Sequence, residues 1–145
     1  MDKTKILFVC IHNSARSQMA EAVINHFYGD KFSAESAGFE SGSLNPFAVK
    51  VMKEWDIDIS ENKTDLVFDF FKQGRIYSYV ITVCDESNAE RCPVFPGITK
   101  RLHWSFPDPS SFSGSDDEKL EFSRKVRDMI KAKIDEWVKR LNSGN

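Results

Sequence analysis

Residues 5–9 (KILFV) form a short, mainly apolar run, and this run constrains the fold more than any other part of the chain. It is rich in residues that favour strands and lacks polar alternation, which is typical of a strand buried on both faces. Residues 16–28 follow after a polar loop and carry apolar side chains at helical spacing: Met19, Ala20, Val23, Ile24 and Phe27. A buried strand followed closely by a helix indicates a parallel sheet covered by helices.

The alternation of strand and helix continues along the chain. We expect further strands at residues 32–36, 79–83 and 100–104, and helices at residues 45–55 and 116–141. Residues 66–71 fit either a helix or a strand, and the turn-rich residues 85–97 indicate a loop, with room for one helical turn. The prediction is therefore an α/β fold with a four-stranded parallel sheet and helices on both of its faces.

Helix starts and the closing helix give more detailed expectations. Asn45 followed by Pro46 is typical of a helix start, and Ser60 followed by Glu61 predicts the start of a further short helix. The closing helix carries an apolar stripe that we expect to be buried: Leu120, Val126, Ile130, Ile134, Trp137, Val138 and Leu141.

Composition narrows the class of protein. With 145 residues, of which 41% are hydrophobic and 29% charged, we expect one domain over residues 1–145, and a monomer. The net charge of −2 and the scattered Lys and Arg residues argue against a nucleic-acid partner. No apolar run is long enough to span a membrane or to serve as a signal peptide, so we expect a cytoplasmic protein without a membrane partner. An odd number of cysteines, three, then favours reduced or reactive thiols over a disulfide framework.

The stretch CIHNSARS places Cys10 where the first strand ends and Arg16 where the helix begins. A tight loop at this position turns its N–H groups inward, and the start of the helix adds a partial positive charge, so the loop can hold a tetrahedral oxyanion. Arg16 can grip two oxygens of the anion, and the positive field favours a nucleophilic Cys10 thiolate. The expected anion-binding residues are Ile11, His12, Asn13, Ser14, Ala15, Arg16 and Ser17, and the Ser17 hydroxyl can donate to the sulfur. The alternative is a small buried cysteine followed by ordinary turn residues, which the flanking strand and helix disfavour.

Cys84 ends the strand predicted at residues 79–83, and Cys92 follows it in the polar loop. A structural zinc site is disfavoured because such sites use closely spaced cysteine pairs, and the histidines, His12, His26 and His103, are scattered. Two interpretations remain: Cys84 and Cys92 pack as inert thiols, or they take part in redox chemistry.

The segment VCIHNSARSQMAEA resembles the phosphate-binding loop of the low-molecular-weight protein tyrosine phosphatase superfamily, and RSQMAEA is similar to its arsenate reductase branch. Further segments extend the resemblance over essentially the whole chain: ESAGFESGSLNPFAVKVMKEWDIDIS, TVC, RCP, HWSFPDP and the final helix. It implies a phosphatase-like fold with the phosphate-binding loop after the first strand. It also implies reduction of arsenate to arsenite in arsenic detoxification, with phosphate and sulfate as competing anions.

The resemblance implies a relay of three thiols. Cys10 attacks arsenate, Cys84 then attacks Cys10 and releases arsenite, and Cys92 attacks Cys84. The resulting disulfide between Cys84 and Cys92 is reduced by thioredoxin. In the same way the resemblance makes Asp108, held between two prolines, the general acid, although a turn-forming aspartate is the alternative. Some reductases of this branch also hold a potassium ion at positions that match Asn13, Glu21, Ser36 and Asp65.

Some positions depart from the pattern. Typical thioredoxin-linked members resemble Cys-Thr-Gly-Asn-Ser-Cys-Arg, whereas this chain has Ile11, His12 and Ala15, and its spacing from Cys84 to Cys92 is longer by one residue. Thioredoxin is therefore one candidate electron donor beside glutaredoxin or glutathione. Two other functions remain open: a tyrosine phosphatase that uses Cys10, Arg16 and Asp108, and an oxyanion-binding redox sensor. The tyrosine pair typical of the phosphatase branch is absent after Asp108.

Overall fold

The computed structural model describes residues 3–84 and 91–143. Its strands are β1 (Thr4–Cys10), β2 (Phe32–Gly38), β3 (Tyr79–Thr82) and β4 (Lys100–His103). Its helices are α1 (Arg16–Phe27), α2 (Pro46–Lys53), α3 (Val67–Lys72) and α5 (Asp116–Ser143), together with a short 3-10 helix at Pro109–Ser111. None of the described helices combines the length and the apolarity that a membrane crossing requires.

The strands form one parallel sheet in the order β2-β1-β3-β4, as predicted. The central strand β1 pairs with β2 from Thr4–Phe32 to Cys10–Gly38, and with β3 from Ile6–Tyr79 to Val9–Thr82. Every residue of β1 from Ile6 onward is buried, because both of its edges and both of its faces are covered. The strands that follow β1 in the chain, β2 and β3, lie on opposite sides of it, and ligands bind at the carboxyl ends of strands at such switch points.

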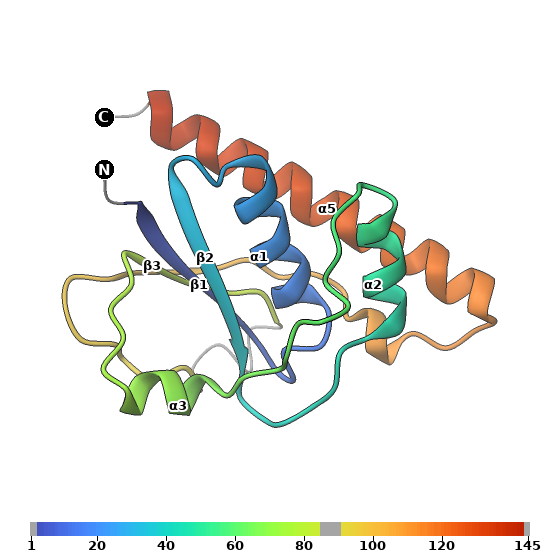
Figure 1. Ribbon diagram of the computed structural model, residues 1–145, viewed down its shortest axis with the longest axis horizontal. Coiled ribbons are helices and arrows are strands. Elements are labelled where there is room, and N and C mark those ends of the chain that lie inside the picture. The colour runs from blue at the N-terminus through green and yellow to red at the C-terminus, as the bar shows by residue number, and fades with distance from the viewer. Residues whose placement is uncertain (1–2, 85–90, 144–145) are drawn as a thin grey trace.

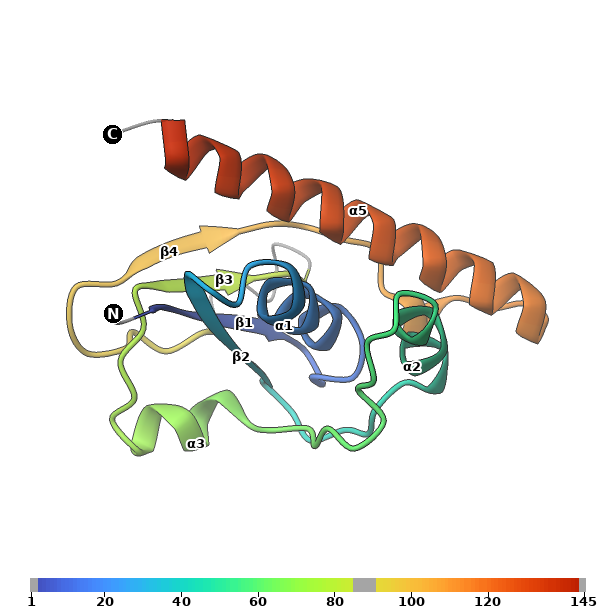
Figure 2. The same ribbon diagram turned by 45° about the horizontal axis from the view of Figure 1, so that its top comes forward.

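Helices cover the two faces unequally (Figures 1 and 2). Helices α1 and α5 lie on one face, and α2 packs against α5 at one end of the layer. The short α3 lies on the other face, so the fold class predicted from the sequence is confirmed. Asn45 caps α2 as expected, because its side chain accepts hydrogen bonds from the N–H groups of Phe47 and Ala48.

Some local predictions were wrong. Ser60 begins no helix: its N–H and its hydroxyl both donate to Asp58, at 2.9 and 2.6 Å, so residues 58–62 form a turn instead. Leu141 is 37% exposed because α5 extends beyond the layer that it covers, whereas Val126, Ile130, Ile134 and Val138 are buried.

The ambiguous residues 66–71 lie mainly in α3. The loop predicted at residues 85–97 lies partly outside the described residues, since residues 85–90 are not among them.

Candidate functional site

The loop between β1 and α1 is built as an anion cradle. Three of its carbonyls point outward and accept hydrogen bonds from the segment after β2: Phe39 N–H to Cys10 (3.1 Å), Glu40 N–H to Ile11 (2.9 Å) and Asn45 N–H to Ser14 (2.9 Å). The N–H groups of residues 11–15 make no hydrogen bond to any other residue that the structure describes. Ala15, the N-cap of α1, offers no capping side chain, and the first turn has no acidic residue. Both the loop and the helix start are therefore available to an anion.

Gly38, at the end of β2, supports this loop from behind. A Cβ on Gly38 would lie only 2.7 Å from Asn13 N and 2.8 Å from His12 C and Ile11 O. These are backbone atoms of the loop, so they cannot rotate away as a side chain would. The sequence analysis did not single out Gly38; the only signal was its place in the Ala-Gly-Phe segment that closes the strand.

Asn13 fixes the shape of the cradle from inside. Its backbone has φ +55°, a left-handed conformation that Asn tolerates better than most residues. Its amide donates to Ser17 Oγ at 2.7 Å, and its side-chain oxygen accepts from the amide of Gln18 at 3.1 Å and from the Asp65 N–H at 3.0 Å. Gln18, which the sequence analysis did not single out, also donates to the carbonyl of Lys63 at 3.0 Å. Asn13 is fully buried, so these bonds satisfy polar atoms that water does not reach.

Cys10 is positioned as a nucleophile at the base of the loop. Its sulfur lies 2.9 Å from Ser17 Oγ and is 2% exposed. Ser17 accepts a hydrogen bond from Asn13, which leaves its own proton available to the sulfur. A hydroxyl that donates to sulfur stabilises the thiolate, which is the nucleophilic form.

Arg16 and Asp108 meet at the loop although they are distant in sequence. Arg16 Nη2 lies 3.5 Å from Asp108 Oδ2, and Nη1 donates to the carbonyl of Phe106 at 3.2 Å. The Asp108 carboxylate also accepts hydrogen bonds from the Ser110 N–H at 2.9 Å and the Ser111 hydroxyl at 3.0 Å. These contacts fix the carboxylate beside the guanidinium that is expected to grip the anion. The predicted pairing of acid and anion loop is therefore present in space.

Cys84 and Cys92 are both buried thiols, with 0% and 4% of their surfaces exposed. Val83 N–H donates to the carbonyl of Val9 at 2.8 Å, so the residue that follows, Cys84, lies at the same edge of the sheet as Cys10. Burial raises the pKa of the Cys92 thiol to about 11, and the Arg101 guanidinium opposes this shift. Arg101 also donates to the Cys92 carbonyl at 3.1 Å. Arg101 was not identified from the sequence, because its exposed, charged strand position gives no signal there.

The residues predicted to hold potassium lie near one another. Glu21, Ser36 and Asp65 line a cavity of about 200 Å³ together with Glu35 and Arg75. The Ser36 hydroxyl donates to Glu21 at 2.5 Å. Burial raises the pKa of Glu21 to about 7; the bond from Ser36 opposes this shift, and the charges of Glu35 and Asp65 add to it. A bound cation would offset the cost of keeping this carboxylate charged away from water. The oxygen donors therefore fit a hard monovalent ion.

Transition metals have no matching group of donors. Within residues 3–84 and 91–143, no three His, Cys, Asp or Glu side chains are grouped so that they could hold a metal ion. The fourth predicted potassium ligand, Asn13, contacts the Asp65 segment through its side-chain oxygen.

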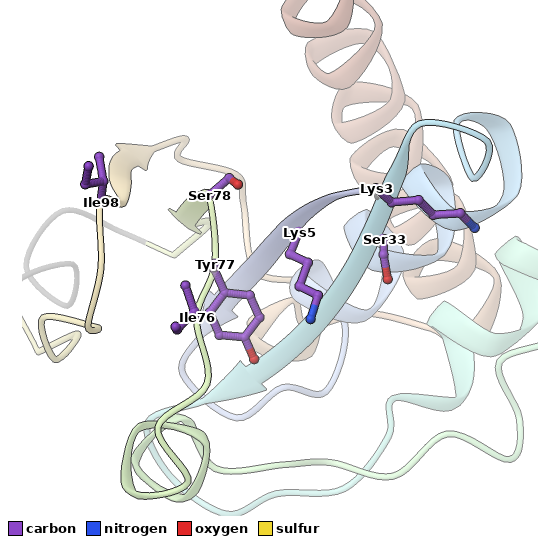
Figure 3. A pocket seen from close by; sticks show the side chains of 7 residues that line it. All are labelled: Lys3, Lys5, Ser33, Ile76, Tyr77, Ser78 and Ile98. Atoms are coloured by element: carbon purple, nitrogen blue, oxygen red, sulfur yellow. The ribbon is translucent and has the colours of Figure 1, made fainter. Parts of the chain in front are cut away.

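A second, open pocket of about 680 Å³ lies at the opposite end of the sheet (Figure 3). It is lined by residues at or near the amino ends of the strands: Lys3, Lys5, Ser33, Ile76, Tyr77, Ser78 and Ile98. None of the predicted site residues lies in it. The candidate chemistry is therefore confined to the carboxyl edge of the sheet, as expected for a parallel α/β fold.

Comparisons with known proteins agree with this geometry. Residues 5–145 match the family model described as low molecular weight phosphotyrosine protein phosphatase. The chain is 43% identical to an arsenate reductase of Bacillus licheniformis over 135 residues, which is 92% of this chain and 94% of that relative. It is 40% identical to an arsenate reductase of Bacillus subtilis over 139 residues, 95% of this chain and 97% of the relative.

A solved structure of an arsenate reductase in the phosphate-binding state is also similar. It superposes with a TM-score of 0.74 at 31% sequence identity, over 94% of this chain and 98% of that one. The likeness in sequence and in fold thus covers nearly the whole chain, including the loop that carries Cys10 and Arg16. On these grounds the chain belongs to the low molecular weight phosphotyrosine protein phosphatase family.

Proposed function

We propose that this protein reduces arsenate to arsenite through a relay of its three cysteines, and so serves arsenic detoxification. The observation that carries the proposal is the placement of Cys10 in an anion cradle with Cys84 at the same sheet edge. A phosphatase needs only the first thiol, whereas net reduction of an oxyanion needs a second one. Relatives that are at least 40% identical over most of the chain are arsenate reductases, which supports this choice.

Arsenate binds first, as a tetrahedral oxyanion. The N–H groups of residues 11–15 and the fork of Arg16 bind its oxygens, and the Cys10 sulfur lies at the base of the cradle. Phosphate and sulfate have the same shape and a similar charge, so they compete for this loop. No further cofactor is needed for binding.

The Cys10 thiolate then attacks arsenic, and one arsenate oxygen leaves as water with a proton from Asp108. Cys84 next attacks the Cys10 sulfur. The sulfur–arsenic bond breaks, its electron pair stays on arsenic, and arsenite leaves while a Cys10–Cys84 disulfide forms. Two thiols are thereby oxidised and As(V) is reduced to As(III).

Cys92 completes the relay by attacking Cys84, which frees Cys10 and leaves a Cys84–Cys92 disulfide. Because Cys84 and Cys92 are buried in the reduced protein, their segment must move before an external reductant can reach the disulfide. Thioredoxin is the proposed reductant of the last disulfide. Such a relay works in a reducing compartment, so we place the protein in the cytoplasm. We further propose that it acts as a monomer.

One assay tests the function and the donor. Arsenate is added to the protein with thioredoxin, thioredoxin reductase and NADPH, and NADPH oxidation is followed. Parallel samples contain glutaredoxin, glutathione, glutathione reductase and NADPH instead. We expect arsenate-dependent NADPH loss with thioredoxin, and at most one turnover for Cys92→Ser. Sustained cycling of Cys92→Ser would exclude the relay. Loss of NADPH in the glutaredoxin samples alone would mean that glutaredoxin, and not thioredoxin, is the electron donor.

Phosphatase activity is a second candidate, because Asp108 lies 3.5 Å from Arg16, where it can protonate a leaving alcohol. Hydrolysis of p-nitrophenyl phosphate without any arsenate-dependent NADPH loss would support the phosphatase instead. A redox sensor without turnover would show neither activity, and the loss of Asp108 would leave its oxidation unchanged.

We further propose a potassium ion at Glu21, Ser36 and Asp65, beside Asn13. The partly buried Glu21 carboxylate supplies the negative charge that would hold the ion, and the ion would stabilise the loop through the Asn13–Asp65 contact. Potassium should raise the melting temperature of the wild type above that in lithium, but not that of Glu21→Gln. Glu136→Gln, on the exposed face of α5, is the control; equal responses of both variants would exclude the site.

A further inference from the structure

The face of β4 that contacts the Cys92 segment is distinct from the face that contacts α5. Tyr79 of β3 packs against Trp137 of α5, with ring centroids 4.9 Å apart. Lys100 is paired with Tyr79 in the sheet, so it shares that face, and the next residue, Arg101, lies on the opposite one. Arg101 therefore extends to the side of the sheet where Cys92 lies.

Arg101 contacts Cys92 through one hydrogen bond. Its Nη2 donates to the Cys92 carbonyl at 3.1 Å, and the positive charge held there opposes the rise in the pKa of the Cys92 thiol that burial causes. Two other titratable groups that the structure describes near Cys92 have partners of their own. The Arg91 guanidinium pairs with Glu40 at 3.1 Å and lies over the ring of Phe39, and His103 contacts Thr82 through Nδ1 at 2.7 Å.

The thiol of Cys92 needs such a partner. Burial raises the pKa of this thiol to about 11 even though the Arg101 charge opposes the rise, so little of Cys92 is thiolate near neutral pH. Only the thiolate attacks a disulfide, so burial slows the last internal step of the proposed relay. Arg101 lies at an exposed position of β4 and donates to the Cys92 backbone, so a charge that persists at every working pH stands beside this residue.

We infer that Arg101 is a positioning residue that holds Cys92 and stabilises its thiolate for attack on Cys84. This role rests on the proposed function and adds a residue to it. In the step, the Cys92 thiol gives its proton to solvent and its sulfur bonds to Cys84. The Cys10–Cys84 bond breaks, and Cys10 leaves as a thiolate in the anion loop, so no external oxidant or reductant is consumed.

The expected effect is moderate, because two consequences of losing the cation oppose each other. A tenfold smaller thiolate fraction is partly offset by a more basic, more nucleophilic sulfur, which reacts about threefold faster per thiolate. The net exchange in Arg101→Gln should therefore be about threefold slower for each tenfold loss of thiolate.

The first test measures Cys92 alone, without arsenate. In a Cys10→Ser, Cys84→Ser background, the reaction of Cys92 with 2,2′-dithiodipyridine is followed from about pH 7 to about pH 10. This reagent is neutral, so the arginine does not attract it. We expect Arg101→Gln to displace the rate profile to higher pH, Arg101→Lys to restore it, and Lys100→Gln to leave it unchanged. Lys100→Gln removes the same charge from the same strand, but on the other face.

A purely structural role gives a different result. If the arginine only kept the segment closed, Arg101→Gln would change the rate by the same factor at every pH, and Arg101→Lys would not restore the profile. That outcome, or an unchanged profile in Arg101→Gln, would overturn the inference.

The second test uses the full three-cysteine chain in a single turnover with arsenate. Arsenite release should be the same in the wild type and Arg101→Gln, while peptide mapping should show the Cys84–Cys92 disulfide forming about threefold more slowly in the variant. Equal rates of disulfide formation would also overturn the inference. If the wild type releases no arsenite, the proposed function fails, and the arsenate-free test still decides the role of Arg101.

Discussion

Gly38→Ala tests whether the anion loop depends on close support from β2. The new methyl group would lie 2.7 Å from Asn13 N, while ordinary contacts begin at 3.4 Å, so the loop must move by about 0.7 Å. Overpacking of this kind costs about 1–3 kcal/mol of stability. Misplacement of a catalytic group by about 1 Å lowers the rate up to about 100-fold. We therefore expect a modest loss of stability together with a large loss of anion binding and turnover.

The measurements are urea unfolding, phosphate binding by calorimetry, and single-turnover arsenite release. Gly74→Ala is the matched control: Gly74 has φ +71°, so alanine is strained there by about 1 kcal/mol, but no atom lies within 4 Å of the added Cβ. The control should lose stability and keep normal phosphate affinity. If Gly38→Ala binds phosphate as tightly as Gly74→Ala at equal stability, the loop does not depend on Gly38 and the reasoning is refuted.

Three further substitutions test separate contacts. Ser17→Ala removes the hydroxyl beside Cys10, a charge-assisted bond worth about 1.5–3 kcal/mol, so the thiolate fraction should fall about 10- to 100-fold. Because the remaining thiolate is more nucleophilic, Cys10 alkylation should slow about 3- to 10-fold, and an unchanged rate would contradict this role. Asp108→Asn should slow p-nitrophenyl phosphate hydrolysis and first-turnover arsenite release about 100-fold, while calorimetry finds phosphate bound at least as tightly. Hydrogen bonds from Arg124 lower the pKa of Glu54 to about 2, so its stabilising effect is present above about pH 4.5 and is lost as the pH falls toward 2. Urea unfolding should therefore show a larger loss of stability across this range for the wild type than for Glu54→Gln, and parallel losses would refute the coupling.

The main elements could be predicted because each has a local signal. The buried strand β1 is continuously apolar, and α2 begins where Asn45 precedes a proline. The local prediction at Ser60 was wrong because the same residue types serve in caps and turns. Here the Ser60 hydroxyl donates to the Asp58 carboxylate and does not cap a helix. Local sequence does not decide such competition.

The site was predictable only in part. Cys10 and Arg16 are close in sequence and flank a recognisable loop, whereas the position of Asp108 beside Arg16 could be expected only from the family resemblance. The packing residues Gly38 and Gln18 were missed, because their roles arise from contacts across the fold. The high pKa of the Cys92 thiol is likewise a product of burial, which no local pattern reports.

The order of the strands also explains why the relay would need Cys84. Cys10 ends β1, Cys84 follows the adjacent β3, and Cys92 is held by Arg101 of the next strand, β4. Two strand spacings amount to about 10 Å, while a disulfide needs Cα atoms within about 7 Å. Cys92 should therefore be unable to replace Cys84 in attacking Cys10. We expect Cys84→Ser to bind arsenate but to release no arsenite, as judged by arsenic speciation. Peptide mapping should find no Cys10–Cys92 disulfide in this variant. If that disulfide forms, strand order does not impose the sequence of thiol exchanges.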